Sequence, residues 1–540
     1  MKDNSTKTKI GQILTLSEMS SRKIITIFAL LMIISLGIRL SYFPYNVPIT
    51  LDGVDYFTYA MEIAKTGKFP AYTNFANNGW PSFLSIFFSL MKSDNFLDYM
   101  MLQRYLAVGI SIVTAIPIYL LCMRFFSKVY SLIGVVLFLF DPRIIINSLN
   151  GLTEPLFLFL GVITFYLFLD RSTKYVWASF GTAAIASLIR YEFLLVLIPI
   201  SMMYFIRFRR NNSFILKYII AIAIFILLIV PMAYIRIQTT GQDGLLSSLM
   251  GHQSYLEQHI IHGIPDSDDP IPGHDNQNKI LYFLSSGIFG ILKYSIWSWI
   301  PILIFFIPVG CTLIVKNIRK LIDCKVITIF LLSGTMLIPT VFAYGRGIQE
   351  TRYLFIIFPL FYLISLYTVK RINLKLEKRF FSLILIICII IGCMAFLEYK
   401  KVDYEYERDA FIVAKEIVKD AHAINNYSEN KYIKEAEIAR NWPNLPKANT
   451  SGHVSLETTK ISTESYKTVE DFISKSREYG LTHIVADKVD KSFLKDVFVD
   501  DKNFPYLLKT FDSTEHGFKY QVKIYKIDYN IFEKMFRKNK

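Results

Sequence analysis

Three carboxylates follow directly on the first strongly apolar segment of the chain. They are Asp52, Asp55 and Glu62, within ITLDGVDYFTYAMEIAKTGKFP at residues 49–70. In a helix, these acids and Tyr59 share one face, because successive residues are about 100° apart. A helix that only lies on lipid would carry Lys and Arg on its polar face, since anionic headgroups repel acids. The acids therefore suggest chemistry: a carboxylate partly shielded from water holds a proton more tightly and suits a general base for a hydroxyl or an amine.

The same acids also have a structural interpretation. Asp52 fits the N-cap of a helix, and Asp55 fits the third helical position, where a negative charge is stabilised by the helix dipole. From the residues alone both interpretations stay open.

Charged and aromatic residues also stand at the ends of later apolar segments. They are Glu154 in NSLNGLTEPLFLFL, Arg190 and Glu192 in SLIRYEFLLVLIP, and Arg346, Arg352 and Tyr353 in AYGRGIQETRYLFIIFP. The planar fork of an arginine can hold phosphate oxygens by two parallel hydrogen bonds. The structural alternatives are a helix-dipole acid for Glu154, mutual neutralisation of Arg190 with Glu192, and anchoring at the membrane interface for the Arg and Tyr residues.

The elements that position these residues are expected to be membrane helices. The chain of 540 residues is 53% hydrophobic and 15% aromatic, more than a soluble core needs. Apolar windows recur up to residue 398, and each approaches the length that crosses about 30 Å of hydrocarbon. Eleven spans are predicted, at 24–43, 105–123, 129–147, 154–169, 175–190, 192–206, 214–234, 287–315, 326–344, 353–369 and 380–397.

The net charge of +15 reflects orientation, not nucleic-acid binding, because Lys and Arg concentrate in alternate loops. The loops that contain RFFSK, RSTK, RFRRNNSFILK, KNIRKLIDCK and KRINLKLEKR are predicted to face the cytoplasm, as is the N-terminal segment 1–23. The protein is expected in the plasma membrane as a multi-pass protein.

Three predicted extracytoplasmic segments complete the organisation. WPSFLSIFFSLM, at 80–91, is too short to span, so it is expected to be an interfacial or re-entrant helix within an outer cap at 44–104. Residues 235–286 are predicted to form an outer loop, because Gly, Pro and Asp interrupt regular structure there. The tail, 399–540, alternates helical and strand periodicities and is predicted to be a small mixed α/β domain outside a membrane domain at 24–398.

The first outer segment resembles a family pattern. DGVDYFTYAMEIAKTGKFP is similar to the first outer loop of the C-type (GT-C) membrane glycosyltransferases, which include the dolichyl-phosphate-mannose protein mannosyltransferases and the lipid A aminoarabinose transferases. Their pattern is an Asp-Glu pair, with Tyr four, Ala eight and Gly fifteen residues after the Asp. Asp52, Tyr56, Ala60 and Gly67 match it. Gly53 replaces the second acid, for which Asp55 is the candidate stand-in. The resemblance covers about residues 24–370.

The resemblance implies an α-helical polytopic membrane protein of the GT-C type that transfers a sugar from a polyprenyl-phosphate-linked donor to a glycan, lipid or protein acceptor at the outer membrane face, with inversion. It implies that Asp52 is the general base, assisted by Asp55 and Glu154. It places the substrate and the donor phosphate near Tyr56, Arg190, Glu192, Arg346, Arg352 and Tyr353.

Two alternative functions and one cofactor question stay open from the sequence. A lipid or solute transporter would carry polar residues at mid-membrane, and a non-catalytic assembly protein would be indifferent to the loss of Asp52. No cofactor and no metal ligand set is predicted, although Asp52, Asp55 and Glu154 offer the hard oxygen ligands that a divalent cation prefers.

Overall fold

The computed structural model describes residues 20–71, 77–255, 257–258, 279–321, 323–376, 381–447 and 457–536. The chain divides into two compact units. The first, which we call the helical unit, comprises Met1–Phe43, Asn74–Phe83 and Arg104–Lys401, and the second, the mixed unit, comprises Pro44–Thr73, Leu84–Gln103 and Val402–Lys540.

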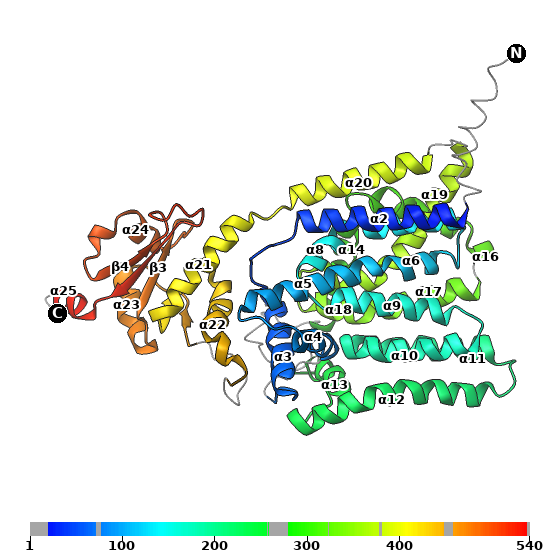
Figure 1. The fold of residues 1–540 in the computed structure, drawn as a ribbon, viewed down its shortest axis with the longest axis horizontal. Coiled ribbons are helices and arrows are strands. Elements are labelled where there is room, and N and C mark those ends of the chain that lie inside the picture. Colours follow the sequence, from blue (N-terminus) through cyan, green and yellow to red (C-terminus); the bar gives the residue numbers. More distant parts are fainter. Residues whose placement is uncertain are drawn as a thin grey trace, which may run out of the picture. The chain divides into compact units, whose positions relative to one another are not determined.

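The helical unit consists of apolar helices. They are α2 (Ser21–Ser41), α6 (Ala115–Cys122), α7 (Lys128–Leu139), α8 (Pro142–Leu149), α9 (Glu154–Phe168), α10 (Thr173–Ile189), α11 (Leu197–Phe208), α12 (Phe214–Thr240), α13 (Leu246–Tyr255), α14 (Lys279–Trp299), α15 (Ile307–Lys316), α16 (Ile318–Leu321), α17 (Cys324–Thr335), α18 (Leu337–Gly345), α19 (Phe358–Leu376) and α20 (Phe381–Tyr399). Helices α4 (Gly79–Leu90) and α5 (Phe96–Val113) contribute residues to both units. Within the helical unit, α9, α10 and α12 lie side by side (Figure 1).

Eight helices in the described part of the chain are long and apolar enough to cross a membrane, or nine if one bent pair forms a single span. The predicted polytopic helical fold is thus confirmed, whereas the number eleven is not. Several predicted spans are short helices, among them Glu154–Phe168 and Leu303–Lys316. The predicted span at 129–147 is a pair of helices, α7 and α8, bent by 49°. Asp141 caps α8 through the amides of Arg143 and Ile144, and Pro142 begins it, because proline fits the first turn of a helix but breaks a helix interior.

Small residues allow close approach between helices of the helical unit. A Cβ atom on Gly290 of α14 would lie 2.6 Å from the Cβ of Tyr344 in α18, and one on Gly287 would lie 2.5 Å from the Val341 carbonyl oxygen. Helix pairs in membranes are held by such packing, because lipid offers no hydrophobic driving force between helices. The contact fixes α18, whose end carries Arg346.

The mixed unit contains a five-stranded sheet in the order β2-β1-β3-β5-β4. The strands are β1 (Ala423–Asn425), β2 (Thr459–Ile461), β3 (His483–Asp487), β4 (Leu507–Asp512) and β5 (Val522–Ile527). Strand β1 is parallel to β2 and β3, whereas β5 is antiparallel to β3 and β4. The predicted mixed α/β tail is confirmed, including the strand in LTHIVAD and the final antiparallel pair. Strands β1 and β2 were not predicted, because three residues are too few for an alternating pattern.

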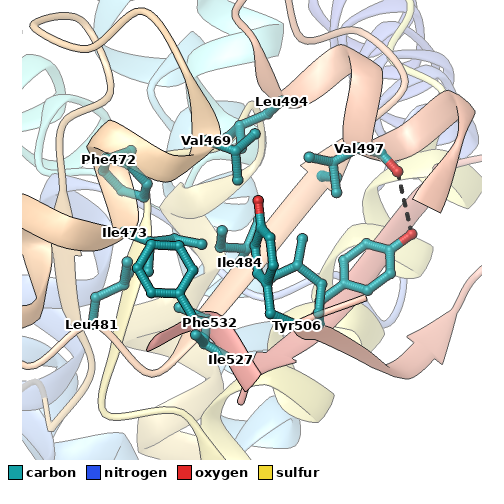
Figure 2. Close-up of a cluster of buried hydrophobic side chains, with 13 residues drawn as sticks. Val469, Phe472, Ile473, Leu481, Ile484, Leu494, Val497, Tyr506, Ile527 and Phe532 are labelled. Atoms are coloured by element: carbon teal, nitrogen blue, oxygen red, sulfur yellow. Dashed lines mark hydrogen bonds between the residues drawn. The ribbon is translucent and has the colours of Figure 1, made fainter. Parts of the chain in front are cut away.

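Helices cover the sheet and close its core. They are α21 (Tyr404–Asp420), α22 (Ile433–Asn441), α23 (Val469–Ser476), α24 (Leu494–Val499) and α25 (Tyr529–Phe536). Phe472 and Ile473 of α23 and Ile484 of β3 are fully buried in one apolar cluster, at whose edge the Tyr525 hydroxyl donates to the Val497 carbonyl at 3.4 Å (Figure 2).

The mixed unit also contains α3 (Asp52–Thr66), which packs against the tail within this unit. The ring of Trp442, which follows α22, lies 6.1 Å from that of Phe57 and 5.3 Å from that of Tyr99, centroid to centroid. The Lys65 ammonium stands 4.7 Å above the same indole. These aromatic and cation–π contacts hold α3, which follows the first apolar helix, to Trp442 in the tail.

Candidate active site

Helix α3 presents the acids of the first outer segment. It begins at Asp52, after Leu51, which has the uncommon positive φ of 54°, and it ends at Gly67, which has the left-handed φ of 69° that glycine adopts without strain. Asp52 is exposed, and Tyr56 is 9% exposed. The predicted helix exists, but Asp52 is its first residue and not its cap. The residues predicted to share one face differ in exposure, because Asp52 is exposed whereas Tyr59 is buried at 1% exposure.

Asp55, the candidate stand-in for the missing second acid, forms an ion pair with Lys434 of α22 inside the mixed unit. Its side chain is 35% exposed and that of Lys434 is 30% exposed. The carboxylate therefore has a structural partner that the sequence did not indicate.

Next to this pair lies Glu435, which is 1% exposed. Burial raises the pKa of Glu435 to about 8, and Asp55 adds to the rise, although Lys434 and Lys460 lower it. Its Oε2 atom has no hydrogen-bond partner in the described structure.

We expect the mixed unit to lose stability as the pH rises from about 4.5, the ordinary value for glutamate, to about 8. In this window the unfolded chain releases the Glu435 proton and the folded chain keeps it, at a cost of about 1.4 kcal/mol per pH unit; above pH 8 both states are ionised and the slope ends. In the Glu435→Gln variant, the free energy of unfolding measured by hydrogen exchange of the α22 amides should no longer fall with pH in this window. An equal slope in Glu435→Gln would contradict the assignment. Glu416→Gln, the same substitution in α21, is the control and should keep the slope.

A second cluster of charges lies wholly within the helical unit. The Arg190 Nη1 atom donates to Glu154 Oε1 at 2.9 Å, and its Nη2 atom donates to Glu192 Oε1 at 2.9 Å. The three side chains are only 12%, 3% and 11% exposed. The guanidinium also lies 5.3 Å from the ring centre of Tyr353 and 5.8 Å from that of Phe157. Arg190 thus bridges two buried carboxylates.

Arg352 joins this cluster from a distant part of the sequence. Its Nη1 atom is 3.8 Å from Glu154 Oε1, and its guanidinium also pairs with Glu350, whose side chain is 50% exposed. The sequence analysis did not single out Glu350, although it stands two residues before Arg352 in QETRY. The guanidinium of Arg346 lies 4.5 Å from the ring centre of Tyr255.

The local conformation of three segments brings these residues together. Glu154 and Pro155 open α9, and Arg190 ends α10 in an extended conformation before a 3-10 helix at Tyr191–Val196. A further 3-10 helix, Thr351–Ile357, carries Arg352 and Tyr353 into α19. In each case a charged residue stands where one helix ends or begins.

A short segment at the start of α4 braces this arrangement. The Trp80 indole donates to the Gly151 carbonyl at 3.2 Å, and the Tyr191 amide donates to Asn77 Oδ1 at 3.4 Å. A Cβ atom on Gly79 would lie 2.8 Å from the backbone of Leu188, so only glycine permits the contact. Residues 77–80 therefore fix the turns that carry Glu154 and Arg190.

These residues enclose a recess, which we call the arginine recess. Its lining residues are Phe157, Arg190, Glu192, Met336, Pro339, Thr340, Arg352, Tyr353 and Ile356. Glu154 Oε2 and Glu192 Oε2 are buried and have no hydrogen-bond partner among the described residues. Two guanidinium groups thus face three carboxylates, including Glu350, and two acceptor oxygens are unused. Such groups are costly unless something donates to them. The recess encloses about 20 Å³, and of these two acids Glu192 lines it, so a donor group that enters there could satisfy Glu192.

The structure thus groups Glu154, Arg190, Glu192, Arg352 and Tyr353 in one cluster, and all of them except Glu154 line the recess. Asp52, Asp55 and Tyr56 belong to the mixed unit. Residues 256 and 259–278 of the predicted outer loop at 235–286 lie outside the described residues, and the rest of it includes the end of α12, all of α13 and the start of α14.

The cofactor question concerns the carboxylates just described. Over the described ranges no three His, Cys, Asp or Glu residues form a group that could hold a metal ion. Glu154 and Glu192 are bridged by Arg190, and two carboxylates that share an arginine do not fit a divalent cation.

Comparison with known proteins shows which solved structures share this fold. No protein-family model and no curated protein matches the chain. The Archaeoglobus fulgidus oligosaccharyltransferase, solved with Zn and sulfate, is 13% identical with a TM-score of 0.53, over 85% of this chain and 67% of that one. The same organism's AglB, solved with an inhibitory peptide and a dolichol-phosphate, is 12% identical with a TM-score of 0.50, over 85% and 69%.

A second neighbour matches over nearly the whole length of both chains. ArnT from Cupriavidus metallidurans, solved with undecaprenyl phosphate, is 9% identical with a TM-score of 0.51, over 94% of this chain and 98% of that one. At these identities the likeness concerns the fold alone. The chain has the fold of the C-type membrane glycosyltransferases, as its resemblance to that family predicted.

Proposed function

We propose that the protein is a membrane glycosyltransferase that moves a sugar from a polyprenyl-phosphate-linked donor to an acceptor at the outer membrane face. The observation that carries the proposal is the buried arginine recess, in a fold whose other members were solved with dolichol-phosphate and undecaprenyl phosphate. A lipid-borne donor explains why charged groups gather at the ends of membrane helices.

In the proposed reaction Asp52 is the general base. It takes the proton from an acceptor hydroxyl or amine, whose oxygen or nitrogen then bonds to the anomeric carbon of the sugar. The bond between that carbon and the phosphate oxygen breaks on the opposite side, which inverts the configuration and releases the polyprenyl phosphate. The exposure of Asp52 at the start of α3 supports this role, because the base must meet an acceptor. Asp55 supports α3 through Lys434, and Tyr56 lines the substrate side of the helix.

The departing phosphate is assigned to Arg352. One of its two carboxylate partners, Glu350, is half exposed, and a phosphate can replace it without exposing a buried charge. The guanidinium fork then stabilises the negative charge that develops as the phosphate leaves. Tyr353 and Arg346 flank this position in the sequence and are proposed to complete the phosphate contacts.

The sugar is assigned to the two carboxylates bridged by Arg190. Glu154 Oε2 and Glu192 Oε2 are acceptors without a donor, and the hydroxyl groups of a sugar would satisfy them. Arg190 holds both carboxylates in place. The predicted outer loop at 235–286 is proposed to cover the bound donor.

The proposal is tested with the purified full chain in nanodiscs, supplied with a panel of radiolabelled sugars on polyprenyl phosphate and with acceptor extracts. Mass spectrometry of glycans and glycolipids from a deletion strain runs in parallel. We expect one donor to be consumed with release of polyprenyl phosphate, and the same glycan to be missing from the deletion strain. A donor that crosses the bilayer with its glycosidic bond intact would identify a transporter. Unchanged glycans together with an inert donor panel would point to an assembly protein.

A further inference from the structure

An apolar groove opens in the helical unit, away from the arginine recess. It encloses about 190 Å³ and is lined by twelve residues, of which Lys370 alone is charged. The wall is formed by α15, α16, α17 and α19, with Phe125 and Phe126 from the connection between α6 and α7. An apolar cavity of about 150 Å³ stays dry and takes up apolar molecules, so this groove is large enough to bind part of a hydrocarbon chain.

The groove and the recess are lined by successive parts of the chain around the start of α19. Helix α19 starts at Phe358, just after Ile356 of the recess, and it reaches Lys370 about 18 Å further along, at about 1.5 Å per residue. Leu360, Leu363, Ile364 and Tyr367 line the groove between these levels. The groove therefore follows the direction that a lipid chain takes in a bilayer.

The wall of the groove is held by close packing. A Cβ atom on Gly310 of α15 would lie 2.6 Å from the Cγ2 of Ile364, and the Thr368 hydroxyl donates to the Phe306 carbonyl at 2.8 Å. Ile314, one turn after Gly310, lines the groove. The helices α15 and α19 are thus fixed together beside the groove, which makes it a preformed site.

Basic residues occur at one end of the groove lining and in a segment that contributes to its wall. Lys370 is exposed, and Arg371 donates to the hydroxyl of the lining Tyr367 at 3.3 Å. The neighbouring segment 316–325, KNIRKLIDCK, carries four basic residues and one acid. That acid, Asp323, accepts a hydrogen bond from the Val326 amide and caps α17. An apolar channel that ends in a basic cluster matches a lipid with a hydrocarbon tail and an anionic headgroup.

We propose that this groove binds one acyl chain of an anionic phospholipid, whose phosphate is held by Lys370 and Arg371. The bound lipid packs between α17 and α19 and helps to hold α19, which continues from the 3-10 helix that carries Arg352. The site is separate from the proposed donor site, where the sugar and its phosphate are assigned to the arginine recess.

The test uses the full chain in nanodiscs of phosphatidylcholine and phosphatidylglycerol in equal amounts, released into native mass spectrometry. We expect the wild type to retain one phosphatidylglycerol molecule. Lys370→Gln should lower this retention about fivefold, since each basic group near a membrane surface contributes about 1 kcal/mol to anionic lipid binding. Lys174→Gln, at an exposed lysine at the start of α10 outside the groove, should leave it unchanged.

A second variant tests the apolar part. Leu363→Trp fills the groove, and it should abolish retention of phosphatidylglycerol. Equal retention of both phospholipids, or unchanged retention in Lys370→Gln, would overturn the proposal even if Leu363→Trp failed to fold. Retention of added polyprenyl phosphate in place of phosphatidylglycerol would also overturn it and would assign the groove to the donor lipid.

Discussion

Replacing Asp52 by asparagine is expected to lower the rate of sugar transfer by about 10²-fold to 10⁴-fold, the range that a positioned general base contributes. The amide has nearly the shape of the carboxylate but cannot take the proton of the acceptor. Because Asp52 is exposed and its burial does not change, the folded state should keep its thermal stability. The measurement is kcat and KM for the donor that the panel identifies, with the unfolding midpoint recorded on the same sample.

The pattern of the two kinetic constants separates the base from a binding residue. We expect kcat to fall while the KM for the donor stays within about twofold, since Asp52 acts on the acceptor proton. Glu62→Gln, an acid-to-amide exchange on the same helix, is the matched control and should retain activity. A rate of Asp52→Asn within threefold of the wild type would remove Asp52 from the mechanism while leaving the fold and the donor assignment intact.

Replacing Arg190 by methionine is expected to destabilise the helical unit by about 3–5 kcal/mol. The reason is that Glu154 and Glu192 would stay buried without their shared counter-ion, and breaking a buried ion pair by removing one partner costs about that much. The unfolding midpoint in detergent should fall by about 4–7 °C, at about 1.4 °C per kcal/mol for a unit of about 350 residues.

A compensating variant shows whether the loss comes from the buried charges. Arg190→Met combined with Glu154→Gln and Glu192→Gln removes all three charges and should recover most of the lost stability, without recovering activity. Arg124→Met is the matched control. Its pair with Asp170 is about one-fifth exposed on both sides, and an exposed pair contributes about 0–1 kcal/mol. Equal losses of stability in the Arg190 and Arg124 variants would show that burial of the Arg190 network does not increase its contribution to the free energy of unfolding.

The two predictions test different parts of the proposal. Loss of activity at Asp52 with stability kept would support the chemistry, whereas loss of stability at Arg190 tests the physical description of the recess. The second result would hold even for a protein with another substrate, because it depends on burial and charge alone.

Several features followed from the sequence because they depend on local composition. The apolar windows predicted membrane helices, since an unpaired backbone cannot exist in hydrocarbon. The alternation in PYLLKTFDS and FKYQVKIYKID predicted the antiparallel strands β4 and β5. The spacing of Asp52, Tyr56, Ala60 and Gly67 predicted the fold through its resemblance to a family. The number of spans did not follow, because hydropathy does not show that a helix such as α7 ends at Leu139 and is followed by a separate, bent helix, α8.

What the tertiary structure decided is which charges become partners. The sequence placed Glu154, Arg190, Glu192 and Arg352 each at the end of an apolar segment, and an Arg190–Glu192 pair was a local alternative. Only the packing of α9 against α10 and against the 3-10 helix Thr351–Ile357 brought Glu154 and Arg352 to the same cluster, across about 200 residues of chain. Likewise, Lys434 became the partner of Asp55 through the packing of the mixed unit. The energy of an ion pair depends on distance and burial in space, and neither quantity is encoded in the local pattern of residues from which helices and strands are predicted.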